Sequence, residues 1–225
     1  MGAVVSRAAE GFLVSLEGPD GVGKSTQAQR LARALRRRHH RVLAVRDPGT
    51  TALGEAVRSL LLDPAVQPPP VPWAEVALFL AARVQLLAEV IEPALADGQI
   101  VVTDRFVDST LVYQGAGRDL DPERLLALHE LVGASRRPDL TVLLDLPAER
   151  ARDRMGRELP LDRLETEPPA YHARVREGFR RLAVRYPERV VVVDADRPPG
   201  EVAQTCLQLV TERLGLAMTD AGRPL

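Results

Sequence analysis

Cysteine is almost absent from the 225-residue sequence, in which Cys206 is the only one. One cysteine excludes an intrachain disulfide framework and any metal site built from several cysteines. The chain also lacks an excess of charge, since 30 Lys and Arg residues are balanced by 31 Asp and Glu residues. Proteins that bind nucleic acid without sequence preference are normally basic, so we expect no nucleic acid partner.

Long apolar segments are missing as well. No hydrophobic run approaches the ~20 residues that cross a bilayer, and the stretch from Met1 to Glu10 has no apolar core of the kind found in signal peptides. We therefore expect a cytoplasmic protein with no membrane partner. A content of 45% hydrophobic and 27% charged residues is ordinary for a globular chain. The length suits a single domain over residues 1–225, with a core over about 12–214.

What the chain does have is an alternation of short apolar runs and helical segments. The runs that predict strands are Phe12–Leu16, Arg41–Val45, Ile100–Thr103, Thr141–Leu144 and Val190–Val193. The predicted helices are Lys24–Arg38, Ala52–Leu62, Trp73–Ala96, Pro122–Ala134, Ala148–Arg154, Pro169–Tyr186 and Gly200–Leu214. Apolar runs of this kind favour parallel strands covered on both faces. We expect an α/β fold, a three-layer doubly wound sandwich with a five-stranded parallel sheet flanked by helices.

A phosphate-binding loop joins the first predicted strand to the first predicted helix. The segment from Gly18 to Ser25 matches the pattern G-x-x-x-x-G-K-[ST], and it contains Lys24, the only lysine of the chain. Glycines let successive N–H groups turn toward a polyphosphate, and the helix N-terminus adds partial positive charge. We expect Lys24 to reach the β- and γ-phosphates of a nucleoside triphosphate and Ser25 to bind Mg²⁺. The predicted nucleotide-binding residues are Gly18, Pro19, Asp20, Gly21, Val22, Gly23, Lys24, Ser25 and Thr26.

Several charged groups are expected at the same edge of the sheet. Asp104 and Arg105 follow the third strand, where Asp104 could hold Mg²⁺ through water and Arg105 could clamp a phosphate; a simple ion pair is the alternative. Asp20 suits a hydroxyl or a metal-bound water of a second substrate better than a phosphate, unless it is merely solvated. Asp47 and Pro48 end the second strand at this edge.

Two further clusters allow a functional and a structural interpretation. Phe79 and Arg83 lie one helical turn apart, which suits a nucleobase, but Phe79 in the core with Arg83 at the surface is equally compatible. The segment from Asp108 to Gly115 offers hydrogen-bonding groups, or is an ordinary helix start. An arginine-rich stretch at about 150–165 predicts either a mobile lid over a transferring phosphoryl group or a solvated helix face.

The sequence resembles the bacterial thymidylate kinases, a family of P-loop nucleoside monophosphate kinases. The segments that carry the resemblance run in consistent order from about Phe12 to Leu214. They are Glu17–Thr26, Arg46–Thr51, Phe79–Arg83, Asp104–Thr110 with Tyr113–Gly115, Pro138–Thr141 with Leu144–Asp145, and Asp162–Glu165. The resemblance implies a P-loop NTPase fold, a homodimer, and phosphorylation of dTMP to dTDP with Mg-ATP on the way to dTTP.

The resemblance also assigns roles to matching positions. Asp20 would face the deoxyribose 3′-hydroxyl or the metal, and Arg105 the dTMP phosphate. Asp47 would steer this phosphate clamp, with its peptide to Pro48 a candidate for the cis form. On the base, Phe79 would stack on thymine, Arg83 would hydrogen-bond its carbonyl edge, Ser109, Thr110 and Gln114 would line the pocket, and Tyr113 would crowd the 2′ position.

The lid completes the implied catalytic set. One subgroup of the family has a basic residue in the phosphate loop where Gly21 stands here. Its absence implies the other subgroup, in which lid arginines supply the charge. The candidates are Arg152, Arg154 and Arg157, alongside Lys24, Asp20 and Arg105.

The sequence departs from the family pattern at Thr50, where glycine is usual, at Asp47, where glutamate is commoner, and in a slightly long lid. The alternatives are a kinase for UMP, CMP or AMP, and a non-catalytic nucleotide-binding switch.

Overall fold

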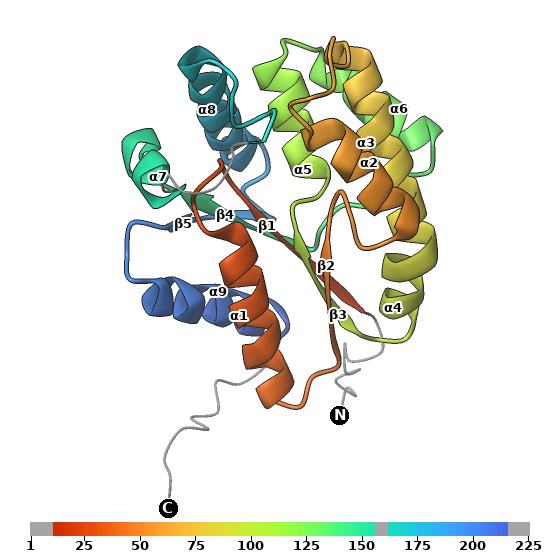
Figure 1. The fold of residues 1–225 in the computed structure, drawn as a ribbon. Coiled ribbons are helices and arrows are strands. Elements are labelled where there is room, and N and C mark those ends of the chain that lie inside the picture. Colours follow the sequence, from red (N-terminus) through yellow and green to blue (C-terminus); the bar gives the residue numbers. More distant parts are fainter. Residues whose placement is uncertain (1–10, 156–161, 216–225) are drawn as a thin grey trace, which may run out of the picture.

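The computed structural model describes residues 11–155 and 162–215, and a five-stranded sheet runs through its centre (Figure 1). All neighbouring strands are parallel, in the order β2-β3-β1-β4-β5. The strands are β1 Phe12–Glu17, β2 Val42–Arg46, β3 Ile100–Asp104, β4 Leu140–Asp145 and β5 Val190–Asp194. Every boundary lies within one residue of its predicted position. The α/β sandwich expected from the sequence is confirmed.

The register of the sheet brings three strand ends to one level. Asp104 of β3 is the partner of Leu16 in β1 and of Arg46 in β2. The loops that follow these three strands therefore leave the sheet side by side. In an open parallel sheet this edge is where ligands bind.

Helices cover both faces of the sheet. Helices α1 (Lys24–Arg37) and α9 (Pro199–Arg213) lie together on one face (Figure 1), where they pack on Val14 and Val102. Leu13 and Val101 point to the other face and join a second core with α3 (Pro72–Leu86) and α8 (Pro169–Arg185). Because successive strand residues face opposite sides, both must be apolar, which explains the unbroken apolar runs.

Side-chain caps account for two of the helix starts, at Ala52 and Pro122. The Thr51 hydroxyl accepts a hydrogen bond from the Gly54 N–H at 3.0 Å, and Asp121 caps its helix through the Glu123 N–H at 2.9 Å. Such caps satisfy N–H groups that a helix start leaves unpaired. The remaining helices are α2 Ala52–Leu62, η2 Leu87–Ile91, α4 Glu92–Ala96, α5 Val107–Thr110, η3 Leu111–Gly117, α6 Pro122–Leu131 and α7 Ala148–Met155.

The long helix predicted over Trp73–Ala96 changes its hydrogen bonding midway. Residues 87–91 form a π-helical turn, and the N–H of Glu92 reaches back to the carbonyl of Leu87. Pro93 follows directly, and a proline ring clashes with the carbonyl four residues earlier. A wider turn lets the chain stay helical around this proline.

Residues 107–117 form the helical segments α5 and η3, so the helix start that the sequence offered as an alternative at Asp108 is found, although no described side chain caps it and the periodicity of the segment does not predict a helix. Nearly all of their side chains are buried. A helix buried on all sides has no polar face, so the 3.6-residue periodicity that reveals amphipathic helices is absent.

Residues 1–10 and 216–225, most of the two predicted tails, lie outside the described residues, as does Arg157 of the predicted lid. Across the described ranges, no helix combines the length and the apolarity needed to cross a membrane.

Candidate functional site

A cleft of about 320 Å³ opens at the carboxyl ends of β1, β2 and β3. It collects most of the residues that the sequence singled out, although they come from segments far apart in the chain. The predicted residues that line it are Asp20, Gly21, Gly23, Lys24, Ser25, Thr26, Asp47, Pro48, Phe79, Arg83, Asp104, Arg105, Ser109, Thr110, Tyr113 and Gln114.

The phosphate loop adopts backbone angles that favour glycine. Gly18 has φ of 137°, and an added Cβ there would strike the backbone carbonyl of Leu144. Gly23 has φ of 94° at the start of α1, and no side chain caps this helix end. The N–H groups of the first turn therefore remain available to an anion. Val22 is buried in the core beneath the loop.

Lys24 lies inside this loop with its charge weakly compensated. The ammonium donates a hydrogen bond to the Pro19 carbonyl at 2.6 Å, and Asp20 lies 3.9 Å away. Burial lowers the pKa of Lys24 to about 8, and the charge of Arg105 acts in the same direction. A phosphate at this position would stabilise the protonated amine.

Ser25 and Asp104 meet across the cleft floor. The Ser25 hydroxyl donates to the Asp104 carboxylate at 2.5 Å. Arg105 forms its ion pair with Asp20 and, within the described residues, none with Asp104, which was the alternative that the sequence left open. Hydroxyl and carboxylate oxygens are ligands that Mg²⁺ accepts, and it usually takes one or two protein ligands beside substrate phosphates and waters. The described residues contain no group of three or more His, Cys, Asp or Glu side chains that could hold a metal alone.

Arg105 is the centre of a second group of contacts. Its guanidinium forms an ion pair with Asp20 and donates to the Tyr113 hydroxyl at 3.0 Å and the Ser109 hydroxyl at 3.2 Å. Tyr113 in turn donates to Asp20 at 2.8 Å. Burial would raise the pKa of Asp20, but Arg105 and Lys24 outweigh it and lower the pKa. Asp20 is thus an ionised acceptor that fixes Arg105, and it is not a freely solvated loop carboxylate.

Arg83 lies beside this group and is only 1% exposed. Its Nε donates to Asp47 at 2.6 Å, its Nη1 contacts Thr110 and His129 at 2.9 Å each, and its Nη2 donates to the Phe106 carbonyl at 3.3 Å. The interpretation that placed Arg83 at the protein surface is therefore wrong.

The protonation state of His129 determines how many N–H groups of Arg83 have a hydrogen-bond partner. Burial lowers the pKa of His129 to about 4, and the charge of Arg83 lowers it further. The neutral ring donates from Nδ1 to the Leu125 carbonyl at 2.7 Å, so its Nε2 accepts from Arg83. A guanidinium has five N–H groups, and four are used here, which leaves one on Nη2 without a partner among the described residues.

Asp47 likewise has one oxygen without a hydrogen-bond partner among the described residues. Its Oδ2 accepts from Arg83, whereas its Oδ1 is buried and has no hydrogen-bond partner in the described part of the chain. Burial raises the pKa of Asp47, although Arg83 opposes the shift. The Asp47–Pro48 peptide is cis, as the sequence left open.

Phe79 gives the cleft an aromatic wall. It is 8% exposed and packs with Val57, Leu61 and Leu164 in a small cluster of its own. It lines the cleft one helical turn before Arg83. Core packing and cleft lining, which the sequence offered as alternatives for Phe79, are both found.

The cleft also contains residues that the sequence analysis did not assign to the site. They are Arg46, Arg58, Leu62, Asp162, Leu164 and Glu165. Arg58 of α2 donates to the Pro48 carbonyl at 3.3 Å. Burial lowers the pKa of Arg58, and the nearby charges of Arg46 and Arg105 lower it further. Three guanidiniums thus converge on one region. The sequence feature that could have identified Arg58 as a site residue is its position on a helix that starts directly after the Asp47–Thr51 loop.

Among the predicted lid arginines, the structure describes the side chain of Arg154, which is not one of the residues that line the cleft. Arg154 of α7 donates to the Ala195 carbonyl at 2.8 Å and lies 3.8 Å from Asp196, in the loop between β5 and α9. The side chain of Arg152 and all of Arg157 lie outside the described part of the chain.

Comparison with known proteins gives a consistent result. A family model described as "Thymidylate kinase" matches residues 16–206. The chain is 45% identical to a thymidylate kinase of Synechococcus sp. over 214 residues, which covers 94% of this chain and 99% of that protein. It is 44% identical to a thymidylate kinase of Deinococcus radiodurans, with 91% and 98% covered. Its fold is similar to the crystal structure of thymidylate kinase from Ehrlichia chaffeensis, with a TM-score of 0.72, 30% identity and coverage of 89% and 99%.

Proposed function

The chain belongs to the thymidylate kinase family, and we propose that the cleft described above is where the γ-phosphoryl group of ATP passes to dTMP. The reaction of the family is the activity of this chain: dTMP is phosphorylated to dTDP, with ATP as the donor. The observation that carries the assignment of the cleft is its continuity from Lys24 in the phosphate loop to Gln114 at the far wall. This continuity gives donor and acceptor adjoining places.

The donor end is the phosphate loop. The uncapped N-terminus of α1 and the loop N–H groups would bind the ATP phosphates, and Lys24 would exchange its contact with Pro19 for the β- and γ-phosphates. We assign Mg²⁺ to Ser25 and Asp104, whose oxygens already lie together. Bound there, the ion would neutralise charge on the phosphates.

The acceptor phosphate belongs beside Arg105 and Arg58. No general base is needed, because the attacking dTMP phosphate oxygen is already anionic, so positioning and charge are what the protein supplies. Asp20 and Tyr113 hold the Arg105 guanidinium in place, and Asp47 holds Arg83. Lid arginines, Arg152, Arg154 and Arg157, would complete the charge when the segment closes.

The base belongs between Phe79 and the polar wall of α5 and η3. Phe79 would stack on thymine, and the unused N–H of Arg83 would donate to the carbonyl at C4. Ser109, Thr110 and Gln114 would line this pocket. Tyr113, fixed by Asp20 and Arg105, would stand against a 2′-hydroxyl. The alternatives, another nucleoside monophosphate kinase or a nucleotide-binding switch, are not favoured by the relatives.

Three further features are proposed from the sequence, the first two from its length and composition and the third from the resemblance. They are a single domain with its core over residues 12–214, a cytoplasmic location and a homodimer. Light scattering tests the dimer, because a mass near the 24.6 kDa of one chain would contradict it.

Isothermal titration of dTMP in the absence of ATP tests the proposed acceptor site. We expect a saturable heat signal with one dTMP bound per chain, and weaker binding of UMP and AMP. Titration of Mg-ATP into the same protein is the control for a folded phosphate loop. Normal ATP binding without a saturable dTMP signal would contradict the acceptor site and favour the switch.

A further inference from the structure

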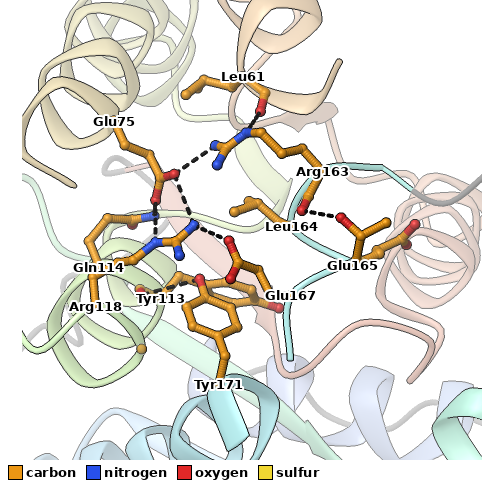
Figure 2. A network of polar contacts seen from close by, with 12 residues as sticks. Leu61, Glu75, Tyr113, Gln114, Arg118, Arg163, Leu164, Glu165, Glu167 and Tyr171 are labelled. Carbon is orange, nitrogen blue, oxygen red and sulfur yellow. Dashed lines mark hydrogen bonds and ion pairs between the residues drawn. The ribbon is translucent and has the colours of Figure 1, made fainter. Parts of the chain in front are cut away.

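Glu75 of α3 is a fully buried carboxylate that lies behind the base pocket and is not among the residues lining the cleft. Figure 2 shows it at the centre of a polar network that joins α3, η3 and residues 163–167, which begin at the end of the predicted lid stretch. Its Oε2 accepts from Arg163 at 2.6 Å and from Arg118 at 3.3 Å. Its Oε1 accepts from Gln114 at 2.8 Å.

This last contact fixes the direction of the Gln114 side-chain amide. A carboxylate can only accept hydrogen bonds, so the amide must turn its NH₂ group toward Glu75. Gln114 is itself 1% exposed and lines the cleft. Its amide oxygen has no hydrogen-bond partner among the described residues. Gln114 therefore presents an acceptor to a molecule in the cleft, and Glu75 is the reason.

The direction of this amide decides which pyrimidine fits. Thymine and uracil have a donor at N3, whereas cytosine has an acceptor there. Bound cytosine would bury the Gln114 acceptor without a hydrogen-bond donor, and a site built for one hydrogen-bonding pattern rejects the other strongly. We propose that Glu75 is a specificity-determining positioning residue, which orients Gln114 to accept from N3–H of the acceptor nucleotide. The proposal rests on the proposed function of the cleft.

The two oxygens of Glu75 differ in a way that makes the proposal testable. Two guanidiniums donate to Oε2, whereas Oε1 receives Gln114 and only a 3.5 Å contact from Arg118. In a Glu75→Gln variant, the amide oxygen belongs with the guanidiniums and the NH₂ group with Gln114. Gln114 must then turn its own oxygen inward and its NH₂ group toward the cleft. The cleft then offers a donor instead of an acceptor at N3 of the base, so this contact favours cytosine over thymine.

The experiment compares dTMP with 5-methyl-dCMP, which differ only at N3 and C4 of the base. We expect wild-type protein to prefer dTMP strongly, and Glu75→Gln to lower the ratio of the two kcat/KM values about tenfold or more. Arg83 continues to oppose the amino group at C4, so the ratio falls without a complete exchange of substrates.

The matched control is Glu167→Gln. Glu167 belongs to the same network through Arg118 at 2.5 Å, but it does not contact Gln114. We expect its ratio to stay within about twofold of wild type, even where its thermal stability falls as much. Equal losses on both nucleotides in Glu75→Gln, with the ratio unchanged, would show a merely structural role and overturn the proposal.

A second variant covers the case in which Glu75→Gln does not fold. Glu75→Asp keeps the charge that Arg163 and Arg118 require but withdraws the carboxylate from Gln114 by one methylene. The ratio should again fall, and a folded Glu75→Asp protein with the wild-type ratio would overturn the proposal. A wild-type chain without dTMP turnover would overturn the proposed function and this inference together, whereas normal dTMP turnover with an unmoved ratio overturns this inference alone.

Discussion

Arg105 combines an unusual backbone with a fully engaged side chain. Its φ of 67° lies in the left-handed region, which residues other than glycine rarely adopt. Such a conformation persists only where the surroundings hold it, and it often marks functional sites. Here Asp20, Ser109 and Tyr113 hold the guanidinium. The side chain is therefore positioned before any substrate arrives.

Replacing Arg105 by alanine should weaken binding and chemistry together. We expect the KM for dTMP to rise and kcat to fall, with a loss in kcat/KM of about 10²-fold or more, because a preorganised charge on the acceptor phosphate is removed. Steady-state kinetics with saturating Mg-ATP measures both constants. Arg136→Ala is the control, since Arg136 forms an exposed ion pair with Glu92 and does not line the cleft. Unchanged kinetics in Arg105→Ala would remove this residue from the mechanism.

Single residues also show where sequence reasoning stops. Arg83 and Phe79 could be predicted as one face of a helix, but the burial of Arg83 could not. It depends on Asp47 and on a neutral His129, which the fold brings in from β2 and α6. Likewise, the acceptor presented by Gln114 depends on Glu75, a contact across 39 positions of the chain. Because such partners lie far apart in the sequence, patterns of local spacing cannot predict them.

Helices and strands could be predicted from the sequence where all of their residues share one kind of environment. The strands are apolar on both faces and end at turns, so their limits follow from the sequence to within one residue. The segment of α5 and η3 is helical but buried throughout, so its periodicity is hidden. Its polar side chains line the cleft and contact residues of other segments. Ser109 and Thr110 contact Arg105 and Arg83, and Gln114 donates to Glu75. Because this segment is buried and lines the site, it lacks the 3.6-residue periodicity by which a helix is recognised in a sequence.

Helix α7 is the element on which the lid proposal depends. Arg150 and Arg154 both contact Asp196 from this helix, and Arg154 also donates to Ala195. These are largely exposed contacts, which contribute little to stability. Leaving these contacts would therefore cost Arg154 little in the proposed lid closure.

Exchanging Arg154 for alanine tests this function of α7. We expect kcat to fall about tenfold or more, because a positive charge near the transferring phosphoryl group is lost, while thermal stability changes little. Arg150→Ala is matched to it, with the same helix and the same aspartate, and it should keep kcat within about twofold. A wild-type kcat in Arg154→Ala would contradict the assignment of Arg154 to the lid chemistry.

At the scale of the whole molecule, the order β2-β3-β1 explains why one cleft exists. It sets the phosphate loop after β1 next to Arg105 after β3 and Asp47 after β2. The fold class and this meeting of strand ends could be predicted, because parallel strands end at one edge. The inward positions of Arg58, Asp162 and Glu165 could not, since they depend on how α2 and the end of the predicted lid stretch pack against that edge.

The most direct test of the account is an ADP-release assay with Mg-ATP and a panel of dTMP, dUMP, UMP, CMP, AMP and GMP. The account predicts strong turnover confined to dTMP, with dUMP weaker. Preferred turnover of another nucleotide would contradict the base pocket formed by Phe79, Arg83 and Tyr113. ATP binding without turnover of any acceptor would contradict the central claim that this cleft is a phosphoryl-transfer site for dTMP.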